Sequence, residues 1–129
     1  MQTAKGTILH NNWDEKPYNE VDGLKSTEAN IDIVMQGDAE LTGKSRSLMQ
    51  YPTAETCHYA GYTTLTGTLG GRSGSFIIYE VGTWKNGVAS SRWEIVENSG
   101  TGELQGLSGT GSYAAEHDKT VHYELTYAL

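Results

Sequence analysis

The sequence predicts an all-β protein: an eight-stranded antiparallel up-and-down barrel that forms a single domain over residues 1–129. Composition is the first observation that supports this, since the chain has 16 glycines, eight tyrosines and many threonines but only two prolines. Glycine and threonine are poor helix formers, whereas threonine and tyrosine are favoured in strands. Alternating apolar residues and regularly spaced turn signals are the other two observations.

The alternation is clearest between residues 24 and 36. Alternate positions carry Thr27, Ala29, Ile31, Ile33 and Met35, and polar residues stand between most of them. A period of two over this length is typical of a strand with one buried face. An amphipathic helix would place apolar residues at i, i+3 and i+4, which this segment does not do.

Seven further segments have strand character, and tight turns separate several of them. The eight segments cover residues 3–13, 24–36, 39–51, 57–69, 73–83, 88–96, 101–113 and 120–129. Gly37-Asp38, Gly70-Gly71 and Asn86-Gly87 are typical of two-residue hairpin turns. The polar stretch 14–23 is expected to be a loop at the rim, and four glycines are expected to bend the seventh segment.

Consecutive antiparallel segments with short links and no helix form a sandwich or a closed barrel. The absence of long crossovers favours the barrel, and closure also removes edge strands that would promote aggregation. An eight-stranded barrel is just wide enough to be filled by side chains or to hold one small ligand.

Charge and cysteine content limit the partners and the compartment. Nine basic residues against sixteen acidic ones give a net charge of −7, which disfavours nucleic acid and anionic membranes. The single cysteine, Cys57, fits a reducing compartment. The N-terminal segment lacks the apolar core of a signal peptide, and no apolar run is long enough to span a membrane. We therefore expect a cytoplasmic protein.

No motif points to a metal, a nucleotide or another cofactor, so none is expected. The glycine-rich stretches 37–45 and 100–106 depart from the spacing of phosphate-binding loops and are not followed by a predicted helix. Cys57 and His58 are adjacent on a predicted strand and therefore point to opposite faces. We expect all four histidines to lie on the surface: His10, His58, His117 and His122.

The register of residues 76–81 decides the chemistry of the interior. If Phe76 and Ile78 face inward, Glu80 does as well, and a buried carboxylate with a raised pKa could act as an acid or a base. If Ile77, Tyr79 and Val81 face inward instead, Glu80 lies in solvent. Both registers remain open from the sequence.

The inward register makes Glu80 the candidate catalytic residue of an interior pocket. Tyrosine hydroxyls would then donate hydrogen bonds to its carboxylate. Aromatic side chains that face inward would line the pocket with apolar bodies and polar tips, although they could equally form a packed core. The candidate ligand-binding residues are Tyr51, Tyr59, Phe76, Trp93 and Tyr123.

Several motifs resemble a bacterial family known as domain of unknown function number 3224, over nearly the whole chain. They are Trp13-x-Glu15, Tyr59-Ala-Gly61, the stretches 67–76 and 99–104, and the closing Tyr123-x-Leu125-x-Tyr127. The resemblance implies an eight-stranded antiparallel barrel similar to allene oxide cyclase. Such barrels and the related dirigent-type barrels bind hydrophobic substrates inside and direct a cyclisation or coupling. The family has no established activity, so the resemblance implies the fold and not the chemistry.

Three hypotheses for the function follow. The first is that the barrel binds a small apolar ligand in its interior. The second is a cyclase or isomerase that acts on a hydrophobic substrate, in which Glu80 or a tyrosine stabilises developing charge. The third is a packed barrel that acts through its surface or by forming a homo-oligomer. An interior cavity would separate the first two hypotheses from the third.

Overall fold

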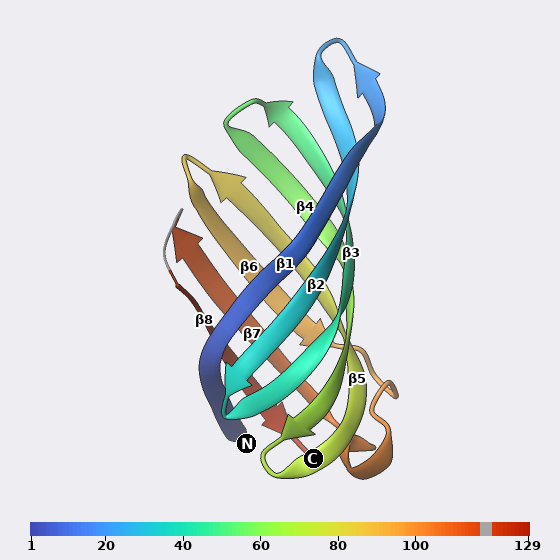
Figure 1. The fold of residues 1–129 in the computed structure, drawn as a ribbon, viewed down its shortest axis with the longest axis vertical. Coiled ribbons are helices and arrows are strands. Elements are labelled where there is room, and N and C mark those ends of the chain that lie inside the picture. Colours follow the sequence, from blue (N-terminus) through green and yellow to red (C-terminus); the bar gives the residue numbers. More distant parts are fainter. Residues whose placement is uncertain (117–119) are drawn as a thin grey trace.

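A computed structural model describes residues 1–116 and 120–129, and His117 lies outside these residues. Eight antiparallel strands follow one another around a closed ring, and β8 pairs with β1 (Figure 1). The strands are β1 (Gln2–Val21), β2 (Leu24–Gly37), β3 (Ala39–Thr53), β4 (Thr56–Leu69), β5 (Arg72–Lys85), β6 (Val88–Ile95), β7 (Ser108–Glu116) and β8 (Val121–Ala128). The eight-stranded antiparallel up-and-down barrel predicted from the sequence is confirmed. No helix in the described part of the chain has the length and apolar character that a membrane crossing requires.

Two of the predicted hairpin turns have the backbone that their residues favour. Gly70 and Gly71 have φ values of 58° and 79°, and Asn86 and Gly87 have values of 51° and 81°. Positive φ at both central residues is typical of the turns whose twist matches that of the flanking strands. These turns fix the pairing of β4 with β5 and of β5 with β6.

The expectation of a rim loop at residues 14–23 is wrong. Strand β1 continues to Val21 and pairs with β2 as far as Leu24, so the two strands form an arm that extends beyond the other hairpins (Figure 1). Backbone pairing with β2 satisfies the polar groups of this segment, and most of its side chains are exposed. Without a buried face, a strand shows no hydrophobic alternation from which it could be predicted.

The seventh strand, in contrast, is shorter than predicted, because it begins at Ser108 and not at residue 101. Residues 102–104 form the short 3-10 helix η1 (Gly102–Leu104), and Gly102 and Gly106 have positive φ values that interrupt an extended chain. The link runs along β5 beyond the end of β6, where Thr101 N–H donates to the carbonyl of Ser75 at 2.8 Å. Leu104 is fully buried.

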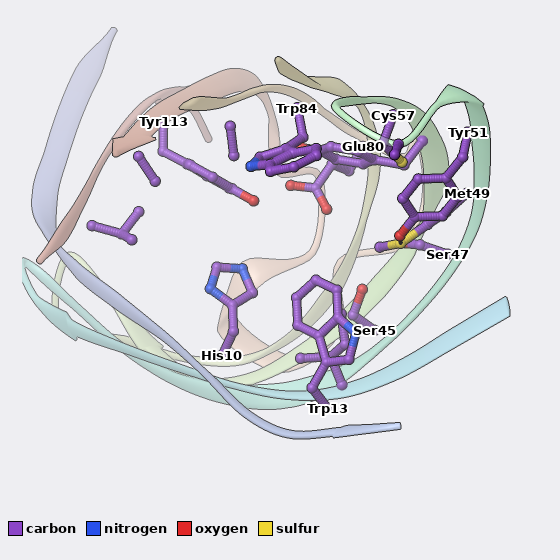
Figure 2. A pocket seen from close by; sticks show the side chains of 16 residues that line it. His10, Trp13, Ser45, Ser47, Met49, Tyr51, Cys57, Glu80, Trp84 and Tyr113 are labelled. Atoms are coloured by element: carbon purple, nitrogen blue, oxygen red, sulfur yellow. Dashed lines mark hydrogen bonds between the residues drawn. The ribbon is translucent and has the colours of Figure 1, made fainter. Parts of the chain in front are cut away.

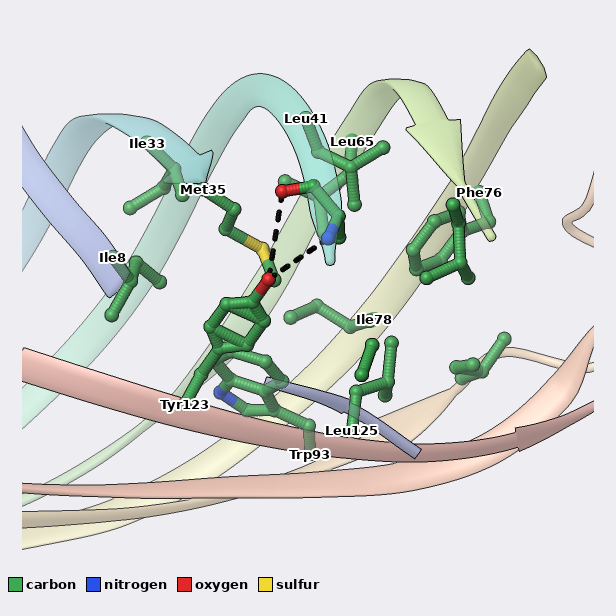
Figure 3. Packing of buried hydrophobic residues seen from close by; sticks show 14 of the residues in the cluster. Ile8, Ile33, Met35, Leu41, Leu65, Phe76, Ile78, Trp93, Tyr123 and Leu125 are labelled. Carbon is green, nitrogen blue, oxygen red and sulfur yellow. Dashed lines mark hydrogen bonds between the residues drawn. The ribbon is translucent and has the colours of Figure 1, made fainter. Parts of the chain in front are cut away.

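The half of the barrel near the two termini is a packed core (Figure 3). Apolar side chains from β1 to β6 and from β8 meet there, and the hydroxyl group of a tyrosine forms hydrogen bonds among them. Tyr123 accepts a hydrogen bond from the Ala39 N–H at 3.2 Å and donates to the Gln36 carbonyl at 3.1 Å. This pair of bonds connects β8 to the turn between β2 and β3 across the interior.

We predict that Phe76→Ala lowers the free energy of unfolding by about 3–5 kcal/mol, because a fully buried ring is replaced by a cavity. Tyr62→Ala is the matched control, since it removes an exposed aromatic ring from the neighbouring strand and should cost less than about 1 kcal/mol. Urea unfolding of both variants measures the difference. Equal losses would show that the two rings contribute alike and that Phe76 does not support the core.

Candidate functional site

The other half of the barrel, at the end of the β3–β4 and β5–β6 hairpins, contains a cavity of about 430 Å³ (Figure 2). The cavity exists because inward positions at this level carry small side chains, namely Ser45 and Ser47 on β3, Ala89 on β6 and Ala115 on β7. In the packed half, the same faces carry larger residues such as Leu41. Larger groups complete the wall: Trp13, Met49, Tyr51, Tyr59, Trp84 and Tyr113.

Glu80 lies on the cavity wall with its carboxylate pointing into the space (Figure 2). Phe76, Ile78 and Glu80 are all buried, so the inward register of this strand is confirmed. Trp93 on β6 donates from Nε1 to Glu80 Oε2 at 2.8 Å. Burial raises the pKa of Glu80, while hydrogen bonding with Trp93, Ser91 and Tyr113 partly offsets the rise because it favours the ionised form.

Two aromatic side chains around Glu80 depend on glycines in the adjacent strands. A Cβ at Gly82 would collide with the Tyr59 ring, which lies across β5 so that its hydroxyl shares a hydrogen bond with Ser91. A Cβ at Gly111 would likewise meet the Trp93 ring. The missing side chains at these two positions therefore set where the aromatic groups beside the carboxylate can lie.

The phenols near Glu80 are hydrogen-bonding groups and not charges. Burial, with the Glu80 charge adding to it, raises the pKa values of Tyr59 and Tyr113. Both therefore remain protonated at neutral pH. In Figure 2 the Tyr113 hydroxyl points toward the Glu80 carboxylate across the cavity. The two hydroxyl groups can donate to a carboxylate or to a bound ligand.

His10 lines the cavity, so the expectation that it lies on the surface is wrong. Its ring centroid is 5.6 Å from that of Tyr113 and 6.4 Å from that of Trp13. Burial lowers the pKa of His10 below its ordinary value of 6.5, so the imidazole is uncharged at neutral pH. The sequence did contain a signal for this position, because His10 continues the alternation of Ala4 and Ile8.

A second carboxylate, Glu15, lies near the mouth of the cavity and was not predicted from the sequence. An extra residue in β1 between Asn11 and Asp14, where Asn12 has a φ of 52°, forms a bulge that turns Trp13 and Glu15 toward the mouth. The motif Trp13-x-Glu15 could have indicated this position. The first strand was expected to end at Trp13, however, so Glu15 was assigned to a loop.

Three side chains donate hydrogen bonds to Glu15. They are the Tyr51 hydroxyl at 2.5 Å, the Thr27 hydroxyl at 2.7 Å and Trp13 Nε1 at 2.9 Å. Burial alone would raise the pKa of Glu15, but these bonds and the charge of Lys25 outweigh it and lower the pKa. The carboxylate therefore connects β1, β2 and β3 beside the cavity.

The structure separates the predicted site residues into two groups. Tyr51, Tyr59 and Glu80 line the cavity. Phe76 and Tyr123 belong to the packed half, and Trp93 lies at the boundary, where it supports Glu80 and stacks on Tyr123 with a centroid distance of 6.2 Å. Alternation predicts which face a residue lies on, but it does not predict the height along the barrel axis at which its side chain points inward.

Metal ligands do not gather in the described residues, where no group of three or more His, Cys, Asp or Glu side chains could hold an ion. The sequence-based expectation that the protein needs no metal or other cofactor stays a prediction.

Comparison with known proteins gives a family and a similar fold. A family model described as a protein of unknown function (DUF3224) matches residues 4–127. A crystal structure of a protein with unknown function from the same family, from Shewanella oneidensis MR-1, is 25% identical and superposes with a TM-score of 0.82. The alignment covers 100% of this chain and 97% of that one. No curated protein matches this chain.

We predict opposite pH effects on stability for the two carboxyl groups. The folded-state pKa of Glu80 is raised, so the native state binds more protons than the unfolded state above about pH 4.5. Glu80 therefore destabilises the fold progressively as pH rises from there through its folded-state pKa. The folded-state pKa of Glu15 is lowered, so its stabilising contribution is present above about pH 4.5 and is lost as pH falls through the folded-state value.

Urea unfolding of Glu80→Gln, Glu15→Gln and the wild type between about pH 3 and pH 8 tests this prediction. Relative to the wild type, Glu80→Gln should gain stability as pH rises, whereas Glu15→Gln should lose it. The two variants change the same chemical group and therefore serve as controls for each other. Parallel pH dependences in the two variants would contradict the prediction.

Proposed function

Because this chain belongs to the DUF3224 family of proteins of unknown function, we propose its function from the cavity: the barrel binds a small, largely apolar ligand in its interior. The observation that carries this proposal is an aromatic-walled cavity of about 430 Å³ in an otherwise packed barrel. Sites for small molecules occupy roughly 300–1,000 Å³ and combine an apolar wall with a few polar groups. A barrel that serves only as a structural unit has no need to leave such a space unfilled.

The polar groups suggest how the ligand is oriented. Glu80, Tyr59 and Tyr113 provide hydrogen-bonding atoms on one part of the wall, and Met49 and Trp84 provide apolar surface elsewhere. Trp13 is half-exposed and lies near Glu15 at the mouth. We therefore propose that a polar head contacts Glu80 and the two phenols, while an apolar body packs against the remaining wall.

A second candidate is a cyclase or isomerase that acts on a hydrophobic substrate, as the likeness to allene oxide cyclase barrels implies. The observation that favours it is the buried carboxyl group of Glu80 among uncharged phenols. Burial raises the pKa of Glu80 toward the range in which general acid–base catalysis is effective at neutral pH. Glu80 would be the catalytic residue in this reading, and turnover of a bound substrate would distinguish it from simple binding.

We predict that the wild type binds N-phenylnaphthylamine, a neutral apolar probe whose fluorescence rises in apolar surroundings. Ser47→Phe should weaken this binding by at least about tenfold, because the new ring occupies the cavity that Ser47 now borders. Leu48→Phe is the matched control, since it places the same ring on the outer face of β3 at an exposed position.

Fluorescence titration of the three proteins at equal concentration measures the effect. Absence of saturable binding to the wild type would contradict the proposal and favour a packed barrel that acts through its surface or by forming a homo-oligomer. Equal binding by Ser47→Phe and Leu48→Phe would place the probe outside the cavity and would also contradict it.

A further inference from the structure

Among the described residues, acidic groups outnumber cationic ones around the cavity. Among the described residues, no lysine or arginine lines it, and His10 is uncharged at neutral pH because burial lowers its pKa. The remaining titratable groups on the wall are Glu80, three tyrosines and the Cys57 thiol. Glu15 adds a second carboxylate beside the mouth, bonded to Tyr51 of the wall. Lys25 lies near Glu15 at the mouth, whereas no lysine or arginine among the described residues stands beside Glu80 on the wall.

We propose that this cavity selects a ligand whose head is an organic cation, such as a protonated amine on an aromatic or aliphatic body, over neutral and anionic ligands of the same shape. The inference rests on the proposed binding function and names the class of ligand for that same site. It is supported by the position of Glu80 and by the aromatic wall.

Among the described residues, the carboxyl group of Glu80 has no cationic partner. Glu80 is 8% exposed, and no ion pair in the described residues includes it. Trp93 satisfies Oε2 from outside the cavity wall, while the carboxylate faces the cavity (Figure 2). Ionisation of a buried carboxyl group is costly when no counter-charge compensates it. A cation bound in the cavity would supply the missing partner.

Aromatic faces next to this carboxylate favour the same head group. Trp84 and Tyr113 line the cavity beside Glu80, and the electron-rich face of such rings attracts cations, including alkylammonium groups. The chain already makes one contact of this kind near the mouth, where Lys25 Nζ lies 5.0 Å from the centroid of the Tyr51 ring. Several aromatic rings around one site are a known arrangement for holding ammonium ligands, and in this cavity the Glu80 carboxyl group lies among them.

Anionic heads are disfavoured by the same arrangement. A carboxylate ligand would have to approach the buried Glu80, and like charges repel more strongly in such surroundings than in water. The net charge of −7 adds a weaker, long-range repulsion outside the mouth. The cavity is thus expected to reject fatty-acid-like ligands even though its volume and apolar wall would accommodate them.

The test uses three probes that share one apolar body: naphthylethylamine, naphthylethanol and naphthylacetate. Isothermal titration calorimetry at neutral pH should show the amine binding at least about tenfold more tightly than the alcohol, with the carboxylate weakest. Glu80→Gln should abolish the advantage of the amine over the alcohol while leaving alcohol binding within about threefold. Glu94→Gln is the matched control, because it removes one negative charge from an exposed position on β6.

The outcomes separate the inference from the function on which it rests. If the alcohol binds as tightly as the amine, or the carboxylate binds best, cation selection is overturned while the cavity remains a ligand site. If the amine keeps its advantage in Glu80→Gln, or loses it in Glu94→Gln, Glu80 is not the local counter-charge and the inference is overturned. If none of the three probes binds, the proposed function itself fails. The ranking of the probes on the wild type decides the matter even if Glu80→Gln does not fold.

Discussion

The interior width of an eight-stranded ring is the constraint on which this structure depends. Eight strands enclose a space that backbone cannot fill, so the inward side chains at each level decide whether that level is solid or hollow. Near the termini those positions carry large residues such as Leu41 and Phe76, and the barrel is packed. Near the hairpin ends Ser45, Ser47, Ala89 and Ala115 replace them, and a cavity results.

Trp93 lies between the packed half and the cavity and contacts residues of both. Its ring stacks on Tyr123 of the packed half, while its Nε1 holds the Glu80 carboxylate that faces the cavity. The orientation of a polar group in the hollow half is therefore fixed by packing in the solid half. A carboxylate held in this way is organised before any ligand arrives, which reduces the ordering that binding requires.

The alternation of residues in the sequence was sufficient for the strand order, most strand boundaries and the inward direction of Trp93 and Tyr123. It was not sufficient for the site, because a period of two gives the face of a residue and not its height in the barrel. Phe76 and Tyr51 were therefore grouped, although one lies in the core and the other at the cavity. Glu15 was missed for a different reason: the exposed arm has no buried face, and the bulge at Asn12 has no sequence pattern specific enough to locate it.

The bulge at Asn12 divides β1 into two parts whose inward-facing residues are set separately. The extra residue shifts the alternation of β1 by one position. Before the bulge, even-numbered residues such as His10 face the interior; after it, the odd-numbered Trp13 and Glu15 face the mouth. The two alternations can change independently. An insertion or deletion at Asn12 changes which residues of the arm face the mouth, and it does not shift the residues of β1 that precede the bulge. Relatives that share this ring can therefore differ in the chemistry of their entrance through a change of one residue in length.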